Sequence, residues 1–181
     1  VTTAERIRRL RLVRPVPVRI LDATAIRAAL SEEMEDDEMR EAEVLYGALG
    51  LLPPHTDVRA LMERVLGEQV VGFYDTHAKE LVLRDDVIAA LATQSSNVAL
   101  DQTGMVIVHE LVHALQDQDL GIGAIYDARE GQPTDAGESF RSLVEGDATL
   151  AMVGYVAEQA VAAQGGDARM RANALSLVTS R

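Results

Sequence analysis

Three polar residues interrupt an apolar stretch, "MVIVHELVHALQDQDL", between residues 105 and 120. His109 and His113 are four residues apart, and Glu110 follows the first histidine. Residues four apart in a helix lie on one face, one turn from each other, so both imidazoles can point at the same place. Two neutral imidazoles suit Zn²⁺, which takes nitrogen, oxygen and sulfur ligands in tetrahedral sites. The spacing therefore predicts that His109 and His113 bind zinc.

Glu110 is the second part of this pattern. One residue along a helix is a rotation of about 100°, which places Glu110 beside the ion and not among its ligands. A zinc-bound water has a pKa of about 7, and a neighbouring carboxylate can accept its proton as the water attacks a carbonyl. The same carboxylate can then protonate the leaving amine. The alternative is a core helix with two histidines and a buried glutamate, and an unpaired buried carboxylate costs free energy. Glu110 is thus the predicted catalytic residue.

A third protein ligand is required, and Glu145 is the favoured candidate. It lies in "SLVEGDATLAM", within a long stretch of helical character. We expect apolar surroundings there, in which an unpaired carboxylate would be anomalous. The next residue, Gly146, disfavours a helix by about 1 kcal/mol relative to alanine, which suggests close backbone approach to a neighbour. Gly146 and Ala148 would let this helix press against the histidine helix while Glu145 reaches the metal.

Other candidate ligands fit less well. Asp119 occupies the position that a third histidine takes in metzincins, but Gln116 stands where that pattern needs a glycine for its turn. Glu138 lies near the start of the second helix, where an acidic residue has an ordinary role at the helix N-terminus. His55 and His77 lie in segments of turn character, and we expect both to be solvated.

The composition of the 181-residue chain excludes several functions. The net charge of -12 argues against binding nucleic acid or anionic lipid, both of which need a basic face. The absence of cysteine excludes disulfides, thiolate metal ligands and a cysteine nucleophile. No apolar run reaches the roughly 18 residues of a membrane span. The acidic stretch at residues 31–43 is typical of a solvated helix face; an interaction module built on it is the alternative.

The periodicity of apolar residues and the positions of proline and glycine predict an α+β fold that is mostly helical. Helices are expected at residues 24–49, 57–66, 86–91, 101–118 and 136–163, with Asp101 or Thr103 capping the fourth. Strands are expected at residues 14–21, 70–74 and 81–83. The first is an edge strand or extended segment because it contains two prolines, and the other two form a hairpin. Residues 121–135 are expected to form a loop.

The length predicts one domain covering residues 1–181. Within it, residues 1–67 would hold the first strand and helices. Residues 68–155 would hold the hairpin and the two helices with the predicted site. Residues 156–181 would form a helical tail.

The two motifs together resemble a known family. "HELVH", followed in a later helix by "EGDA", is similar to the gluzincin metallopeptidases, in particular to bacterial groups whose second motif reads Glu-Gly-x-Ala. The hairpin sequence "GFYDTHAKELVLR" is similar to the small sheet that precedes the active-site helix in those proteins. The resemblance covers about residues 68–155 and implies a zincin-like fold. It also implies zinc on His109, His113 and Glu145, with Glu110 as general base and acid.

The resemblance also implies how a peptide or protein substrate binds. An extended peptide would add to the outer strand of the sheet, which is either Glu80–Arg84 or residues 70–74. Because the chain begins with Val1 and not with Met, we expect an upstream segment to have been removed or omitted. A location in the bacterial cell envelope or a secreted protein is therefore preferred, with a cytoplasmic one as the alternative.

The sequence departs from the gluzincin pattern at one position. Many gluzincins place an aspartate four residues after the ligand glutamate to orient the first histidine, and Thr149 stands there. Asp147 and Asp117 are the two candidates for that role. No motif assigns an oxyanion-stabilising residue. Tyr126 is the better candidate, because Tyr155 would lie about 15 Å along the helix from the ligand glutamate.

The expected function is that of a zinc-dependent peptidase. The alternative is a metal-binding, non-proteolytic protein that keeps the same fold as a scaffold or regulatory domain. The presence of Glu110 favours the peptidase, since a purely structural metal site has no need of that residue.

Overall fold

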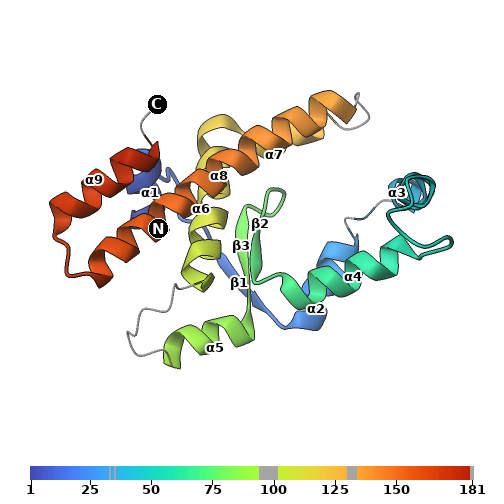
Figure 1. The fold of residues 1–181 in the computed structure, drawn as a ribbon, viewed down its shortest axis with the longest axis horizontal. Coiled ribbons are helices and arrows are strands. Elements are labelled where there is room, and N and C mark those ends of the chain that lie inside the picture. Colours follow the sequence, from blue (N-terminus) through green and yellow to red (C-terminus); the bar gives the residue numbers. More distant parts are fainter. Residues whose placement is uncertain (33, 35, 94–101, 130–133, 180–181) are drawn as a thin grey trace.

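The computed structural model describes residues 1–32, 34, 36–93, 102–129 and 134–179 (Figure 1). The helices are α1 (Thr2–Arg8), α2 (Ala23–Glu32), α3 (Asp36–Ala48), α4 (Val58–Gln69), α5 (Asp85–Thr93), α6 (Gln102–Leu120), α7 (Ile122–Asp127), α8 (Thr134–Ala163) and α9 (Ala168–Thr179). The strands are β1 (Val18–Leu21), β2 (Gly72–Asp75) and β3 (Glu80–Arg84). The described chain is therefore mostly helical with a small sheet, as expected for the α+β class. Within it, no helix is both long enough and apolar enough to cross a bilayer.

The sheet is mixed, with the strand order β1-β3-β2. β1 runs parallel to β3, and β2 pairs with β3 in an antiparallel hairpin. β1 is at the end of this order, which confirms the expected edge strand. Pro17 directly precedes β1 and Pro15 lies two residues before Pro17, and proline cannot donate to a strand ladder. Because β3 has a partner on both sides, the expectation that Glu80–Arg84 could be the outer strand is wrong. Of the two strands considered, only β2 has an open edge.

The hairpin is closed by a turn that Asp75 stabilises. The Asp75 carboxylate accepts hydrogen bonds from the backbone N–H groups of His77 and Ala78, both at 2.8 Å. The Lys79 N–H donates to the carbonyl of Asp75. At the other end of the hairpin, the Arg84 N–H donates to the Val71 carbonyl at 2.9 Å. This bond fixes which residues of β2 direct their backbone N–H and C=O groups toward β3 and which direct them away.

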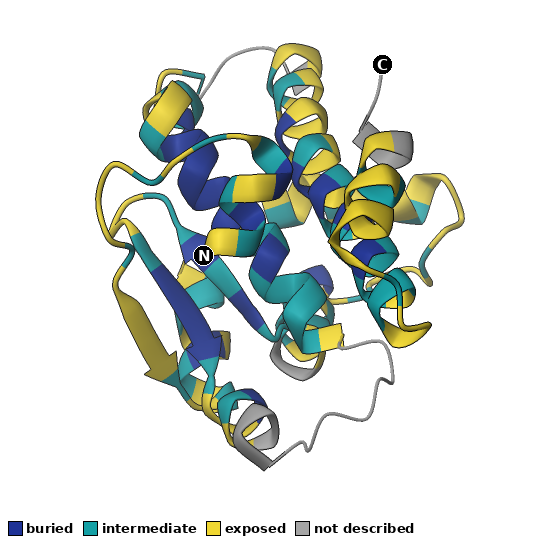
Figure 2. Ribbon diagram, turned by 90° about the vertical axis from the view of Figure 1, so that its left-hand side faces the viewer, coloured by how far each residue is buried: buried dark blue, intermediate teal, exposed yellow. Residues whose placement is uncertain are grey.

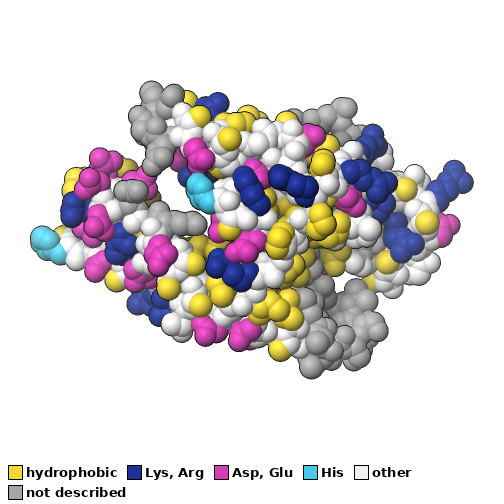
Figure 3. Space-filling view, turned by 180° about the vertical axis from the view of Figure 1, so that it is seen from behind, with side chains coloured by type: hydrophobic (Ala, Val, Ile, Leu, Met, Phe, Trp, Pro, Cys, Tyr) yellow, Lys and Arg dark blue, Asp and Glu magenta, His cyan; other side chains and the backbone are white. Residues whose placement is uncertain are grey.

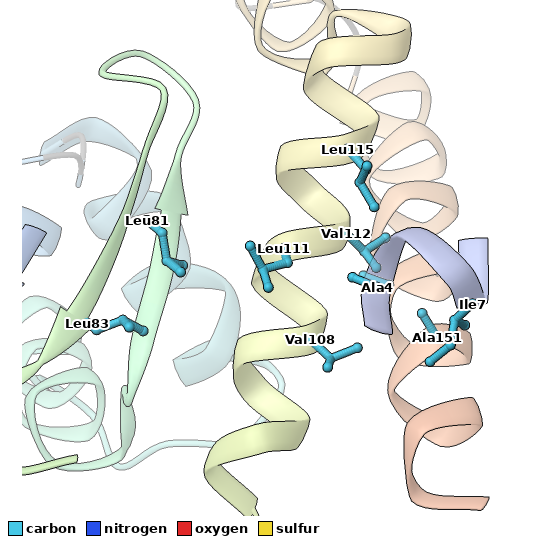
Figure 4. Packing of buried hydrophobic residues seen from close by; sticks show 10 residues of the cluster. Ala4, Ile7, Leu81, Leu83, Val108, Leu111, Val112, Leu115 and Ala151 are labelled. Atoms are coloured by element: carbon cyan, nitrogen blue, oxygen red, sulfur yellow. The ribbon is translucent and has the colours of Figure 1, made fainter. Parts of the chain in front are cut away.

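The core lies on both sides of α6, between the sheet and α8 (Figures 2 and 4). Leu111 of α6 faces Leu81 and Leu83 of β3 (Figure 4). The opposite side of α6 packs on α8 and on α1, a helix that the sequence analysis did not predict. The buried residues there are Ala4, Ile7, Val108, Val112, Leu115, Ala148 and Ala151. The apolar residues around "HELVH" therefore fix α6 against two separate layers.

The expected continuous helix over residues 24–49 is wrong, because α2 and α3 are separate. Arg59 of α4 explains part of the break. Its guanidinium donates to the backbone carbonyls of Ser31 at 3.2 Å and Met34 at 2.6 Å, and to the Asp36 carboxylate at 2.7 Å. The carbonyls of Ser31 and Met34 thus accept hydrogen bonds from Arg59 at the point where the helical backbone bonding between α2 and α3 is interrupted. No single-segment pattern could indicate this contact.

The expected loop at residues 121–135 is also wrong in part, since it contains α7. Gly121 separates α6 from α7 and adopts a left-handed conformation with φ of 68°, which suits glycine. The N–H of Gly123, in the first turn of α7, donates to the carboxylate of Asp117 at 3.1 Å. That bond holds α7 against the end of α6. The predicted cap Asp101 lies outside the described residues.

Candidate metal centre

The two histidines and Glu145 come together at the crossing of α6 and α8. One turn of α6 brings the Nε2 atoms of His109 and His113 to 3.0 Å from each other. The Oε2 atom of Glu145 lies 3.1 Å from the Nε2 of His109 and 3.6 Å from that of His113. Within the described part of the chain, these residues form the only cluster of three or more His, Asp or Glu side chains that could hold a metal ion.

The size of this triangle matches a small tetrahedral ion. Ligands that are each about 2.0–2.2 Å from a tetrahedral Zn²⁺ lie roughly 3.3–3.6 Å apart. The three donor separations in the cluster run from 3.0 to 3.6 Å. The imidazole rings meet edge to face, with an interplanar angle of 84°. Two imidazole nitrogens and one carboxylate oxygen are also a donor set that zinc accepts, so these residues fit the ion.

The position of Glu145 follows from the packing of α8. Val144, Ala148 and Ala151 are buried in the molecule, and α8 packs along α6. Glu145 lies beside this buried row, and its side chain is 51% exposed. The expectation of apolar surroundings for Glu145 is therefore wrong, as is the expected close approach at Gly146. A Cβ added at Gly146 would meet no atom within 4 Å.

The Glu145 carboxylate interacts favourably with both imidazoles. The hydrogen bond with His109 and the nearby His113 ring lower the pKa of Glu145 far below its ordinary range, although partial burial opposes the shift. Burial disfavours the charged form of His113, but Glu145, Glu110 and Gln116 outweigh it and raise the pKa of His113. A cation bound by the same atoms would replace the proton in this attraction.

Glu110 lies on the side of α6 that faces the hairpin. Its Oε2 accepts a hydrogen bond of 2.9 Å from the backbone N–H of Tyr74 in β2. Burial raises the pKa of Glu110, while the nearby histidines and the Tyr74 bond lower it in part. The carboxylate thus lies beside the histidine pair, is oriented by the edge strand β2, and is not part of the cluster of His109, His113 and Glu145.

Gln116 is a residue of the site that the sequence analysis assigned no role. Its Oε1 lies 2.9 Å from the Nδ1 of His113. Its Nε2 donates to the carbonyl of Val144 at 3.0 Å and to the carboxylate of Asp147 at 2.9 Å. Asp147, one of the two candidates for orienting a histidine, therefore reaches His113 through Gln116. Gln116 lies three residues after His113, so helix geometry alone places the two side chains close together. Its partners Val144 and Asp147 on α8 are distant in sequence, and no pattern in the sequence indicates them.

Asp117, the other candidate, has a different role. Its side chain is 2% exposed and accepts bonds from the Tyr74 hydroxyl at 2.9 Å, from Lys79 Nζ at 2.9 Å and from the Gly123 N–H. These partners belong to β2, to the hairpin turn and to α7. Asp117 therefore fixes the hairpin and α7 to α6, and through Tyr74 it supports the strand that contacts Glu110.

A cleft of about 830 Å³ opens over the histidines. Its walls come from β2 and the hairpin turn, from α7, from the first turns of α8, and from Leu30 and Glu38 of α2 and α3. Tyr126 is in this wall and packs edge to face on Phe140, with ring centroids 5.3 Å apart. Burial and the charge of Glu145 raise the pKa of Tyr126, so its hydroxyl stays protonated at neutral pH.

The other residues considered as metal ligands are not part of the cluster of His109, His113 and Glu145. Asp119 is exposed on α6, and this helix continues to Leu120 without the turn that a metzincin ligand needs. Glu138 is in the cleft wall and lies 3.9 Å from Arg141. His77, with a side chain 74% exposed, is solvated as expected. Acidic side chains gather over the end of the molecule formed by α2–α4 (Figure 3), and no residue of α3 is buried.

Comparison with protein-family models, with curated proteins and with solved structures finds no match for this chain. The chemistry of the site therefore follows from its own residues and their geometry.

Proposed function

We propose that the protein is a zinc-dependent peptidase of the gluzincin type, with His109, His113 and Glu145 as metal ligands. The observation that carries the proposal is the combination of two features. Three donor atoms from two helices are spaced for a tetrahedral ion, and a fourth residue, the partly buried Glu110, lies beside them and is not part of the cluster. A site that served only to hold the fold together would not require that carboxylate.

Zinc is favoured among the divalent ions by the donor set. Two imidazoles and one carboxylate suit zinc, whereas magnesium and calcium prefer oxygen ligands. Three protein ligands also leave one tetrahedral position for water or substrate, as in catalytic zinc sites. When bound, the ion would lower the pKa of water and polarise a substrate carbonyl.

Glu110 would move the protons of the reaction. Its Oε2 accepts a hydrogen bond from the Tyr74 N–H, and burial raises the pKa of the carboxyl group above its ordinary value. A carboxylate with a raised pKa is well suited to take a proton from the attacking water and to return it to the leaving amine nitrogen. The peptide C–N bond then breaks to give a carboxylate and an amine.

The cleft wall indicates where a peptide would lie. The Arg84-to-Val71 bond sets the ladder so that the backbone groups of Gly72 and Tyr74 point away from β3. An extended peptide would therefore lie along β2 and bond to its outward-facing backbone groups. The Tyr74 N–H is not among the groups that bind the peptide, because it donates to Glu110. Tyr126, which also lines the cleft, is the proposed donor to the oxyanion of the transition state.

The test is a comparison of two carboxylate-to-amide variants of the same helix. Glu110→Gln is expected to keep zinc and to lower peptide hydrolysis by at least about 100-fold, because it removes the general base. Asp119→Asn, exposed and outside the cleft, is expected to keep both. Zinc is measured by elemental analysis after purification without chelator, and hydrolysis with a mixed library of unstructured peptides.

Two results would contradict the proposal. Full hydrolysis by Glu110→Gln would remove the proposed base. Bound zinc with no hydrolysis by the unmodified chain would favour the non-proteolytic scaffold.

A further inference from the structure

Gln116 connects both helices of the proposed metal centre. It lies on α6, three residues after His113, and only 3% of its surface is exposed. A buried amide must satisfy its oxygen and both of its N–H groups, or it lowers the stability of the fold. All three requirements are met by groups of the site or beside it.

The partners fix which end of the amide is the oxygen. The carbonyl of Val144 and the carboxylate of Asp147 can only accept, so the NH₂ group must face them at 3.0 and 2.9 Å. The amide oxygen then faces the Nδ1 of His113 at 2.9 Å. An oxygen can only accept, so Nδ1 must carry a proton. In the neutral ring this leaves the lone pair on Nε2, the atom that faces His109 and Glu145.

The same amide also joins α6 to the segment that carries Glu145. Val144 immediately precedes Glu145, and Asp147 follows two residues later. Asp147 is held in turn by Arg8 of α1, with Nε at 3.0 Å from Oδ2 and a terminal nitrogen at 2.6 Å from Oδ1. The row Arg8, Asp147, Gln116 and His113 therefore runs from the N-terminal helix to the ligand.

We propose that Gln116 is a positioning residue of the metal centre. It holds His113 in the tautomer that presents Nε2 to the ion, and it holds α8 at the distance where Glu145 reaches the same ion. This inference rests on the proposed function in that the ion is taken to be zinc. Removing a partner that orients a metal ligand typically lowers metal affinity by about 10–100-fold.

The variant Gln116→Met tests this inference, because it keeps the length of the side chain and removes its hydrogen bonds. Zinc affinity, measured by competition with a chromophoric chelator, is expected to fall by about 10–100-fold. Gln118→Met is the matched control on the same helix. Gln118 accepts from the N–H groups of Val13 and Arg14 and donates to the Arg14 carbonyl, so its loss should affect stability without affecting zinc affinity.

A second readout follows the proton itself. Ring ¹⁵N chemical shifts of His113 distinguish an Nδ1-protonated from an Nε2-protonated imidazole, with or without zinc. The unmodified protein and Gln118→Met are expected to show the Nδ1-protonated ring. The metal-free Gln116→Met variant is expected to show a mixture of tautomers, a change that a merely structural role would not cause.

The outcomes separate the inference from the proposed function. If Gln116→Met binds zinc within about threefold of the unmodified protein, or loses no more than Gln118→Met, the inference is wrong and the zinc site stands. If the unmodified protein binds no zinc, both are wrong.

If Gln116→Met fails to fold, Asp147→Ala provides a second test, because it removes one hydrogen-bond acceptor of the Gln116 amide at a partly exposed position. Several-fold weaker zinc binding by this variant supports the inference, and unchanged binding overturns it.

Discussion

Adjacent residues on α6 serve two different sides of the site. Gln116 faces α8 and bonds to His113, to the Val144 carbonyl and to Asp147. Asp117 faces the hairpin and α7, where it accepts from Tyr74, Lys79 and Gly123. The α8 side thus orients the proposed metal ligands, and the hairpin side orients the strand that contacts the proposed base. The two networks have no partner in common, so we expect that the proposed metal binding and the proposed proton transfer can be disturbed one at a time.

The largest effect is expected on the α8 side. Glu145→Ala removes a proposed ligand and should lower zinc affinity by more than the roughly 100-fold that follows loss of an orienting partner. Glu138→Ala, seven residues earlier on the same helix and outside the ligand triangle, should leave zinc affinity unchanged. Chelator competition measures both. Equal losses in the two variants would contradict the choice of Glu145.

Disturbing the hairpin side should produce the opposite pattern. Asp117→Asn removes the charge that pairs with Lys79 and leaves at least one of the buried partners poorly bonded, a loss of about 1–3 kcal/mol in unfolding free energy. Peptide hydrolysis should fall because Tyr74 no longer holds Glu110 in place, while zinc affinity changes less than in Gln116→Met. Urea unfolding and the zinc and activity assays measure these effects. A larger effect on zinc than on hydrolysis would show that the two sides are not separable.

The hairpin side should also respond to acid. Burial opposes the charged form of Asp117, but bonds from Lys79, Gly123 and Tyr74 prevail and lower its pKa. A lowered folded-state pKa contributes stability above the unfolded value of about 3.9, and this contribution is lost as the pH falls through the folded value.

The difference in unfolding free energy between the unmodified protein and Asp117→Asn should therefore be constant above about pH 5 and shrink below about pH 4. Urea unfolding of metal-free protein across this range measures it, since zinc binding has a pH dependence of its own. A difference that does not change with pH would mean that the Asp117 charge does not contribute.

The smallest effects concern two glycines, one on each side. A Cβ at Gly123 would lie 3.0 Å from Lys79 Nζ and 3.1 Å from the Thr76 carbonyl, so Gly123→Ala should destabilise the fold by about 1 kcal/mol. In Gly146→Ala the added Cβ meets open space at an exposed position of α8, and the substitution should stabilise the fold by about 0.5–1 kcal/mol. Thermal unfolding of both variants checks the signs. If Gly146→Ala were less stable than the unmodified protein, the conclusion that Gly146 faces open space would be contradicted.

Local patterns predicted much of the site. The four-residue spacing placed His109 and His113 on one face, because helix geometry alone decides that. The polar turn at residues 75–79 between two apolar segments predicted the hairpin, and the prolines before β1 predicted an edge strand. Glu145 was favoured for its expected apolar surroundings and for close approach at Gly146; both expectations were wrong, although Glu145 does belong to the cluster in the structure.

Contacts between distant segments could not be predicted. The break between α2 and α3 involves Arg59, more than twenty residues further along the chain. Gln116 acquires its role from Val144 and Asp147, which periodicity on one helix cannot bring to it. The parallel pairing of β1 with β3 joins segments separated by α2, α3, α4 and β2. In each case the deciding partner belongs to another element.

The central claim is that one zinc ion is held by His109, His113 and Glu145. Anomalous diffraction at the zinc edge, from crystals of protein purified without chelator, tests it most directly. The account predicts a single peak about 2.0–2.2 Å from the Nε2 atoms of both histidines and from a carboxylate oxygen of Glu145. No peak at this position, or a peak bound by Glu138 or Asp119 in place of Glu145, would contradict it.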